Sequence, residues 1–173
     1  MSESKPVVVV LLGMMGAGKS SVGSALSELT GRPYLDNDAL VRLATGRAAA
    51  DIDASDGEAE LHRAEAAALA HALSQPGPLI AGAAAWVVDD PGSAALLRAQ
   101  PAVVYLRAET ETLRARIGAG AGRRGDATDL AWLRSRLARR DRAYRELATI
   151  TIDTDELTAA KVAQRIHTEL LGG

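Results

Sequence analysis

The sequence predicts a three-layer α/β/α domain built around a parallel sheet. Short runs rich in aliphatic and β-branched residues alternate with longer segments of helical periodicity, which is typical of repeated strand-helix units. The runs are apolar on both faces, as expected for parallel strands that helices cover on each side. Because 173 residues can form one substantial core but not two ordinary domains, we expect a single domain over 1–173.

These patterns also predict the individual elements. The expected strands are Val7–Leu12, Pro33–Asp36, Leu79–Ala81, Ala102–Leu106 and Thr149–Ile152, and the signal is weakest for the second. The expected helices cover residues 19–29, 38–46, 57–74, 92–98, 109–116, 129–147 and 157–171. Ser55 and Glu58 have the spacing of a capping box, which predicts that the long third helix begins between them.

The composition makes a small molecule the expected partner. Lys and Arg number 20 against 22 Asp and Glu, so no strong field attracts nucleic acid or an anionic membrane. There is no cysteine, which excludes disulfides and thiolate metal sites. The apolar run at 7–12 is far shorter than a membrane span and no secretory cleavage site follows it, so we expect a cytoplasmic protein.

Residues 13–20, Gly-Met-Met-Gly-Ala-Gly-Lys-Ser, match the phosphate-binding P-loop pattern. The glycines let successive backbone N–H groups turn toward a phosphate, and the following helix favours an anion at its N-terminus. The lysine reaches the β- and γ-phosphates, and the serine hydroxyl can bind Mg²⁺. A glycine-rich turn with an incidental lysine is the alternative, but the position between a strand and a helix favours the P-loop. The predicted nucleotide-binding residues here are Gly13, Gly16, Ala17, Gly18, Lys19, Ser20 and Ser21.

The P-loop alone does not identify the reaction, because GTPases, ATPases and small kinases share it. No Asn-Lys-x-Asp guanine-binding motif and no convincing Walker B strand follow Ser20, and the small residues at 21–25 suit a compact kinase. Asp36 ends the second predicted strand and Asp38 begins the next helix, so both lie at the sheet edge where ligands of α/β proteins bind. Asp36 or Asn37 alternatively caps the helix that follows, and both roles can coexist.

Arg140 interrupts an apolar helical stripe made by Leu133, Leu137 and Tyr144. The spacing of 4, 3 and 4 residues directs it the same way as the leucines, toward protein or a cleft. A guanidinium in that position needs an anionic partner, which is either a ligand or a carboxylate of the protein.

Together these motifs resemble the shikimate kinases, members of the nucleoside-monophosphate-kinase-like P-loop group. The resemblance covers nearly the whole chain and includes residues 13–20, Asp36 and Asp38, Thr45-Gly46-Arg47, Asp56-Gly57-Glu58, Val104-Tyr105-Leu106, and Arg140 with Tyr144. It implies a monomer with sheet order 2-3-1-4-5, acceptor-binding helices at about 37–75 and a short mobile lid at about 117–128. It also implies ATP as donor, Mg²⁺ as cofactor and a role in aromatic amino acid biosynthesis.

The resemblance assigns roles to single residues of this sequence. Asp38 would bind the acceptor hydroxyls and act as base, and Arg140 would hold the acceptor carboxylate. The catalytic set would be Lys19, Asp38 and Arg123, the metal would lie at Ser20 and Asp36, and Arg116 would stack on adenine.

Three departures from the family pattern concern the acceptor side and the lid. The family carries Phe-Arg-x-x-Glu on the third helix, where this sequence has Leu61-His62-Arg63-Ala64-Glu65. Arg63 cannot replace the arginine, because one residue rotates a side chain by about 100°. His62 is therefore either structural or an acceptor-binding residue that Glu65 orients. The family's Gly-Gly-Gly appears as Gly82-Ala83-Ala84, which would place two methyl groups in the site, and its lid Arg-Pro-Leu-Leu appears as Arg123-Arg124-Gly125-Asp126.

The sequence thus predicts an ATP-dependent phosphotransferase that acts on a hydroxyl of shikimate or a related small hydroxy acid. Its predicted acceptor-binding residues are Asp38, His62, Gly82, Ala83, Ala84 and Arg140. One alternative is a kinase for gluconate or another polyol. The other is a nucleotide-binding regulator without kinase activity.

Overall fold

A computed structural model describes residues 8–118 and 129–172. Five strands form one sheet of order β2-β3-β1-β4-β5, and each neighbouring pair is parallel. This confirms the predicted architecture and strand order. The strands are β1 (Val8–Leu12), β2 (Tyr34–Leu35), β3 (Leu79–Gly82), β4 (Val103–Arg107) and β5 (Ile150–Asp153).

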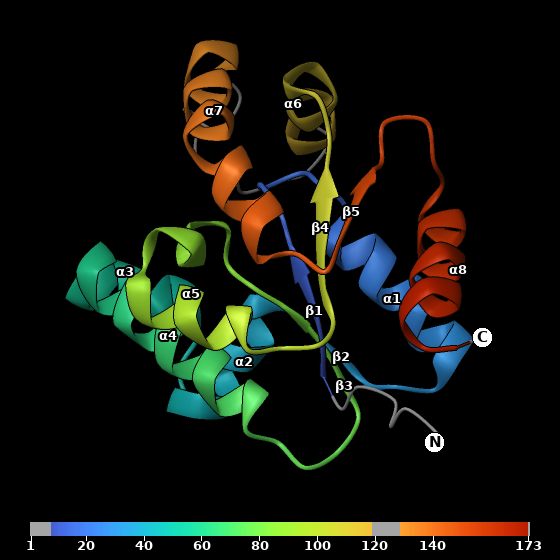
Figure 1. The fold of residues 1–173 in the computed structure, drawn as a ribbon. Helices are drawn as coiled ribbons and strands as arrows, with labels where there is room; N and C mark the ends of the chain where they lie inside the picture. Colours follow the sequence, from blue (N-terminus) through green and yellow to red (C-terminus); the bar gives the residue numbers. More distant parts are fainter. Residues whose placement is uncertain (1–7, 119–128, 173) are drawn as a thin grey trace.

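Helices cover both faces of the sheet (Figure 1). On one side α1 (Lys19–Thr30) packs against α8 (Ala159–Leu170). The other side holds α2 (Asn37–Thr45), α3 (Ala49–Asp56), α4 (Glu58–Leu73) and α5 (Pro91–Arg98). Two further helices, α6 (Thr110–Gly118) and α7 (Leu130–Leu147), extend beyond the carboxyl end of β4.

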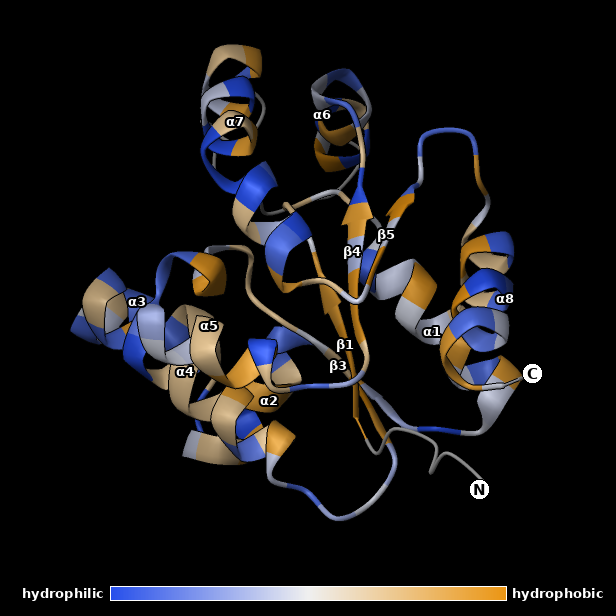
Figure 2. Ribbon diagram, viewed as in Figure 1, coloured by the Kyte–Doolittle hydropathy of each residue, from blue (hydrophilic) through white to orange (hydrophobic). Residues whose placement is uncertain are grey.

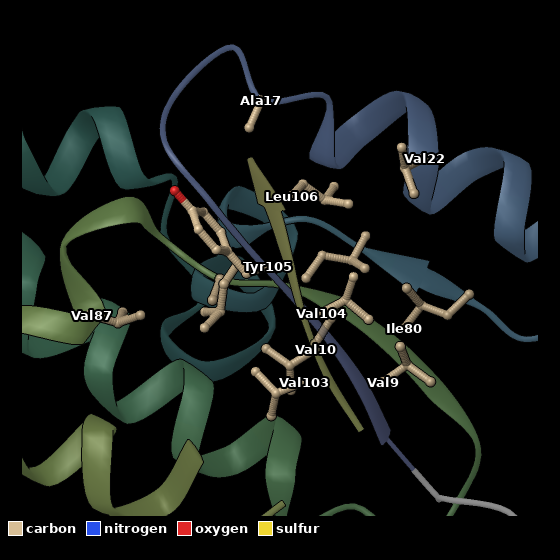
Figure 3. Packing of buried hydrophobic residues seen from close by; sticks show 14 of the residues in the cluster. Val9, Val10, Ala17, Val22, Ile80, Val87, Val103, Val104, Tyr105 and Leu106 are labelled. Carbon is tan, nitrogen blue, oxygen red and sulfur yellow. The ribbon is translucent and has the colours of Figure 1, made fainter. Parts of the chain in front are cut away.

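The core lies along the central strands. All five residues of β1 are buried, and the strands are the most hydrophobic part of the fold (Figure 2). Their aliphatic side chains pack against α1 on one face and against the helices of the opposite face on the other (Figure 3). The chain has no phenylalanine, so the stacked rings of Tyr105 and Tyr144, 4.8 Å apart between centroids, supply large aromatic volume.

Helix α1 approaches β2 closely at Gly23. A Cβ atom at this position would lie 2.4 Å from the ring of Tyr34, a separation that real side chains do not tolerate. The absence of a side chain at Gly23 therefore permits the close approach of α1 to Tyr34.

Two elements were not predicted, and the predicted cap of α4 is wrong although the helix begins between Ser55 and Glu58 as expected. Helix α3 and the short 3₁₀ helix η1 (Ala85–Asp89) occupy segments that the sequence left without an element. Ser55 does not cap α4, because it lies inside α3 and its hydroxyl donates to the backbone carbonyl of Asp51 at 2.8 Å. Gly57 precedes α4 instead, with a φ of 87° that ends one helix and begins the next. Within the described ranges, none of the helices is both long and apolar enough to cross a membrane.

Candidate active site

The P-loop connects the carboxyl end of β1 to α1 and depends on its glycines. Gly13, Gly16 and Gly18 have φ values of 152°, 84° and 100°, where residues with a Cβ are strained. A Cβ on Gly13 would also lie 2.6 Å from the carbonyl oxygen of Leu106, and one on Gly16 would lie 2.8 Å from that of Leu113. The loop can therefore form only with glycine at these positions, as the motif predicted.

The loop presents donors to an anion. The N-cap of α1 is Gly18, which has no side chain that could accept from the first-turn N–H groups. These N–H groups of the 12-residue helix therefore remain available to an anion at the loop. The Lys19 ammonium donates to the carbonyl oxygens of Gly13, at 2.5 Å, and Met14, at 3.2 Å. The side chain of Ala17 is buried, whereas Ser20 and Ser21 are exposed. Phosphate oxygens can thus reach Lys19 and the two serines, whereas the Ala17 N–H donates to the carbonyl oxygen of Met14 at 3.1 Å.

Arg116 anchors the P-loop to the segment after β5. Its guanidinium donates to the hydroxyl and the carbonyl oxygen of Thr154, each at 3.0 Å, and to the carbonyl oxygen of Ala17 at 3.2 Å. These bonds give Arg116 a structural role that the sequence did not predict. Its stacking on adenine stays a prediction.

Asp36 and Asp38 lie where β2 meets α2. Asp36 caps the helix, since its Oδ1 accepts a hydrogen bond from the backbone N–H of Ala39 at 2.7 Å. The capping alternative is thereby confirmed, and the cap uses only one of the two carboxylate oxygens. Asp38, in the first turn of α2, is exposed.

Ser20 and Asp36, the predicted metal-binding residues, both lie close to the Tyr34 phenol. Burial raises the pKa of this phenol, and the Ser20 hydroxyl and the Asp36 charge are both close enough to act on it. In the described part of the chain, no three Asp, Glu or His side chains gather to enclose a metal ion. A hydroxyl and one carboxylate beside a phosphate site fit Mg²⁺, which keeps several waters and binds phosphates rather than an all-protein cage.

His62 forms a stacked pair with Trp86. The ring centroids are 4.0 Å apart and the planes differ by 17°, while the imidazole Nε2 lies 3.9 Å from the carboxylate of Glu58. Of the two alternatives for His62, orientation by a direct hydrogen bond to Glu65 is not what the structure shows, because both Glu65 oxygens bond elsewhere. One Glu65 oxygen accepts a hydrogen bond from Asn37 Nδ2 at 2.6 Å, and the other accepts one from Trp86 Nε1. Burial raises the pKa of Glu65, and these two hydrogen bonds oppose the rise.

Arg140 is buried and paired, as its place in the apolar stripe predicted. Its Nε and Nη2 each lie 2.9 Å from Oδ2 of Asp89, and its side chain is only 8% exposed. The ion-pair alternative is thus realised, although it does not exclude a ligand on the remaining N–H groups. One helical turn later, the Tyr144 hydroxyl donates to the carbonyl oxygen of Ala85 at 2.5 Å.

The segment after β3 corrects the expectation that two methyl groups enter the site. Ala83 is 2% exposed, and its N–H donates to the carbonyl oxygen of Leu11 at 3.1 Å, so its methyl group belongs to the core. Only Ala84 is partly exposed. Gly82 is closely packed, because a Cβ there would lie 2.8 Å from the hydroxyl of Tyr34 and would require that side chain to shift.

Helix η1 connects the acceptor-side residues, and sequence reasoning missed it. Ala85 accepts from Tyr144, Trp86 contacts His62 and Glu65, and Asp89 holds Arg140. The available signal was Trp86, one of two tryptophans in a chain with 3% aromatic residues, two residues after the altered glycine segment at 82–84. The predicted lid arginine Arg123 and residues 119–128 lie outside the described residues.

Comparison with known proteins agrees with this geometry. Residues 15–171 match the family described as shikimate kinase. A shikimate kinase of Symbiobacterium thermophilum is 38% identical over 94% of this chain and 95% of the relative, and one of Stenotrophomonas maltophilia is 36% identical over 94% and 91%. A solved structure of shikimate kinase from Acinetobacter baumannii, in complex with shikimate, has a TM-score of 0.85 and 30% identity, and covers 98% of this chain and 95% of that one.

Proposed function

The chain belongs to the shikimate kinase family, and we propose that it transfers the γ-phosphoryl group of ATP to a hydroxyl of shikimate with the help of Mg²⁺. It is an ATP-dependent small-molecule kinase, and aromatic amino acid biosynthesis is the setting that fits this activity. A polyol kinase and a regulator without activity are not favoured, because these relatives are shikimate kinases that match over 94% of the chain.

One observation carries the proposal. The carboxyl ends of β1, β3 and β2 bring the P-loop, the segment at 82–84 and the Asp36–Asp38 pair to the same edge of the sheet. A phosphate donor on the P-loop and an acceptor beside Asp38 would therefore be neighbours, which is the arrangement that direct phosphoryl transfer requires.

The chain's own residues perform three tasks in this reaction. Lys19 and the N–H groups of the loop stabilise charge on the transferring phosphoryl group. Arg123, which occupies the sequence position of the family's lid arginine, would contribute a second positive charge there. Ser20 and Asp36 would hold Mg²⁺, which neutralises charge on the β- and γ-phosphates when bound. Asp38 orients the acceptor hydroxyl and accepts its proton.

Acceptor binding falls to His62, Ala84 and Arg140, with Gly82 and Ala83 shaping the backbone below them. Arg140 offers its guanidinium to the acceptor carboxylate from a position that Asp89 fixes. We expect the protein to act as a monomer in the cytoplasm.

An activity assay tests the function. Purified protein is incubated with ATP and Mg²⁺, and ADP release is measured with shikimate, quinate or gluconate. We expect shikimate-dependent ADP release that Lys19→Met abolishes. Nucleotide binding without acceptor-dependent release for any of these acids would contradict the proposal and favour a regulator.

A further inference from the structure

Trp86 is the one tryptophan that contacts the candidate acceptor residues. It lies in η1, four residues after Gly82, and its ring covers one face of the His62 imidazole at 4.0 Å. The other tryptophan, Trp132, lies on α7, where the Arg136 guanidinium stands 5.1 Å from its ring. The two residues therefore provide a matched pair for experiments.

The ring of Trp86 is held in place by a buried carboxylate. Its indole N–H donates to Glu65, which is 7% exposed and also accepts from Asn37. Asn37 stands between Asp36 and Asp38 in the chain. One carboxylate thus connects η1, α4 and the first turn of α2, so the orientation of Trp86 is tied to the position of the aspartate pair.

The stack restricts the orientation of the His62 ring. Trp86 covers one face of the imidazole, yet the His62 side chain is still 35% exposed, so part of it can meet a ligand. A rigid ring surface of this kind favours contact with another ring over contact with a flexible chain. A guanidinium, in contrast, recognises any accessible carboxylate.

We propose that Trp86 is a specificity-determining residue, which positions His62 as a flat surface for a cyclic hydroxy acid. This inference rests on the proposed function and deepens it. Trp86 itself acts through His62, so it is a positioning residue. The pair makes the acceptor site selective for a ring-shaped acid over an open-chain acid that carries the same carboxylate and hydroxyl groups.

Kinetics of Trp86→Leu test the proposal. We expect the KM for shikimate to rise about tenfold, because the stacking surface and its hydrogen bond are both lost. The KM for ATP and kcat should stay within about twofold of wild type, since the hydrogen bond and the ring contact of Trp86 go to Glu65 and His62 rather than to the P-loop. Trp86→Phe keeps a ring but cannot donate to Glu65, so its KM for shikimate should lie between those of wild type and Trp86→Leu. Equal changes in the KM for shikimate and the KM for ATP, or no change in the KM for shikimate, would overturn the proposal.

Fluorescence gives a readout that does not depend on turnover. Trp132→Phe leaves Trp86 as the sole tryptophan, because the sequence contains two. Titration of this variant with shikimate in the presence of ADP should change the emission of Trp86 and saturate. Gluconate at the same concentrations should not produce the change. Unchanged emission at shikimate concentrations that saturate turnover would refute the role of Trp86, even if Trp86→Leu does not fold.

The outcomes also separate this inference from the proposed function. If wild-type protein phosphorylates none of the acids tested, the proposed function fails. If it phosphorylates shikimate and Trp86→Leu has the wild-type KM for shikimate, only the role of Trp86 fails.

Discussion

The ion pair of Arg140 with Asp89 predicts an unusual response to Asp89→Asn. Asp89 lies in η1 and holds the guanidinium that we assign to the acceptor carboxylate. Removal of the Asp89 charge should destabilise the free protein. It should also strengthen acceptor binding, because the acceptor carboxylate no longer shares the guanidinium with an internal carboxylate.

The size of the effect follows from burial. Arg140 makes two 2.9 Å contacts to one Asp89 oxygen, and its side chain is 8% exposed against 24% for Asp89. Breaking a fully buried pair costs about 3–5 kcal/mol, but Asp89 is partly solvated and asparagine keeps a carbonyl acceptor, so we expect about 2 kcal/mol. For a chain of this length, that loss lowers Tm by about 4–8 °C.

Thermal unfolding with and without shikimate provides the assay. Shikimate should raise the Tm of Asp89→Asn by more than it raises that of wild type. Asp90→Asn is the matched control: it removes the same charge from the adjacent residue, which caps α5 by accepting from the Ser93 N–H at 2.8 Å. Asparagine caps as well as aspartate, so this control should unfold like wild type. Equal losses in both variants, or equal shikimate shifts in Asp89→Asn and wild type, would refute the reasoning.

Three further predictions follow from single side chains. His62→Arg should lower the KM for shikimate roughly ten- to hundredfold by adding charge-assisted hydrogen bonds. Arg63→His, at the exposed neighbouring position, should leave this KM unchanged. A higher KM for His62→Arg would contradict the assignment of residue 62 to the acceptor site. Burial raises the pKa of Glu65, so the stability of wild type relative to Glu65→Gln should fall as pH rises above about 4.3, as measured by urea unfolding; a constant difference would refute the shift. Gly23→Ala should cost about 1–3 kcal/mol through overpacking against a tyrosine ring, and Gly77→Ala, which meets no atom within 4 Å, should be near neutral.

The fold was predictable because its signals are local. The strands of the sheet are short apolar runs, and the P-loop is contiguous, so alternation and one motif predicted the architecture. Helix α3 was missed because its sequence, Ala-Ala-Asp-Ile-Asp-Ala-Ser-Asp, has only two buried side chains and lacks a clear apolar period. The false capping box shows the same limit, since the spacing of Ser55 and Glu58 could not reveal that Ser55 already lies inside a helix.

The two halves of the site differ in how far sequence reasoning reached. The nucleotide-binding half of the site depends on the positive φ angles of Gly13, Gly16 and Gly18. The P-loop motif predicts these glycines directly from the sequence. The direction of Arg140 was also predictable, because helical periodicity gives the face of a side chain. Its partner Asp89 was not, because the pair is 51 residues apart in sequence and forms only when η1 and α7 pack together.

The acceptor-side differences from the family pattern are better understood as one connected arrangement of side chains than as separate losses of binding groups. His62 lacks the reach of an arginine, but Trp86 fills the space beside it and Glu65 bonds to Trp86 and Asn37 rather than to the residue at 62. Residues that share one buried carboxylate do not respond independently to substitution. The gain expected from His62→Arg should therefore depend on Trp86, since the new guanidinium would lie over the indole face that now supports the imidazole. Measured in the Trp86→Leu background, the gain should shrink, whereas an additive result would mean that position 62 binds the acceptor without support from η1.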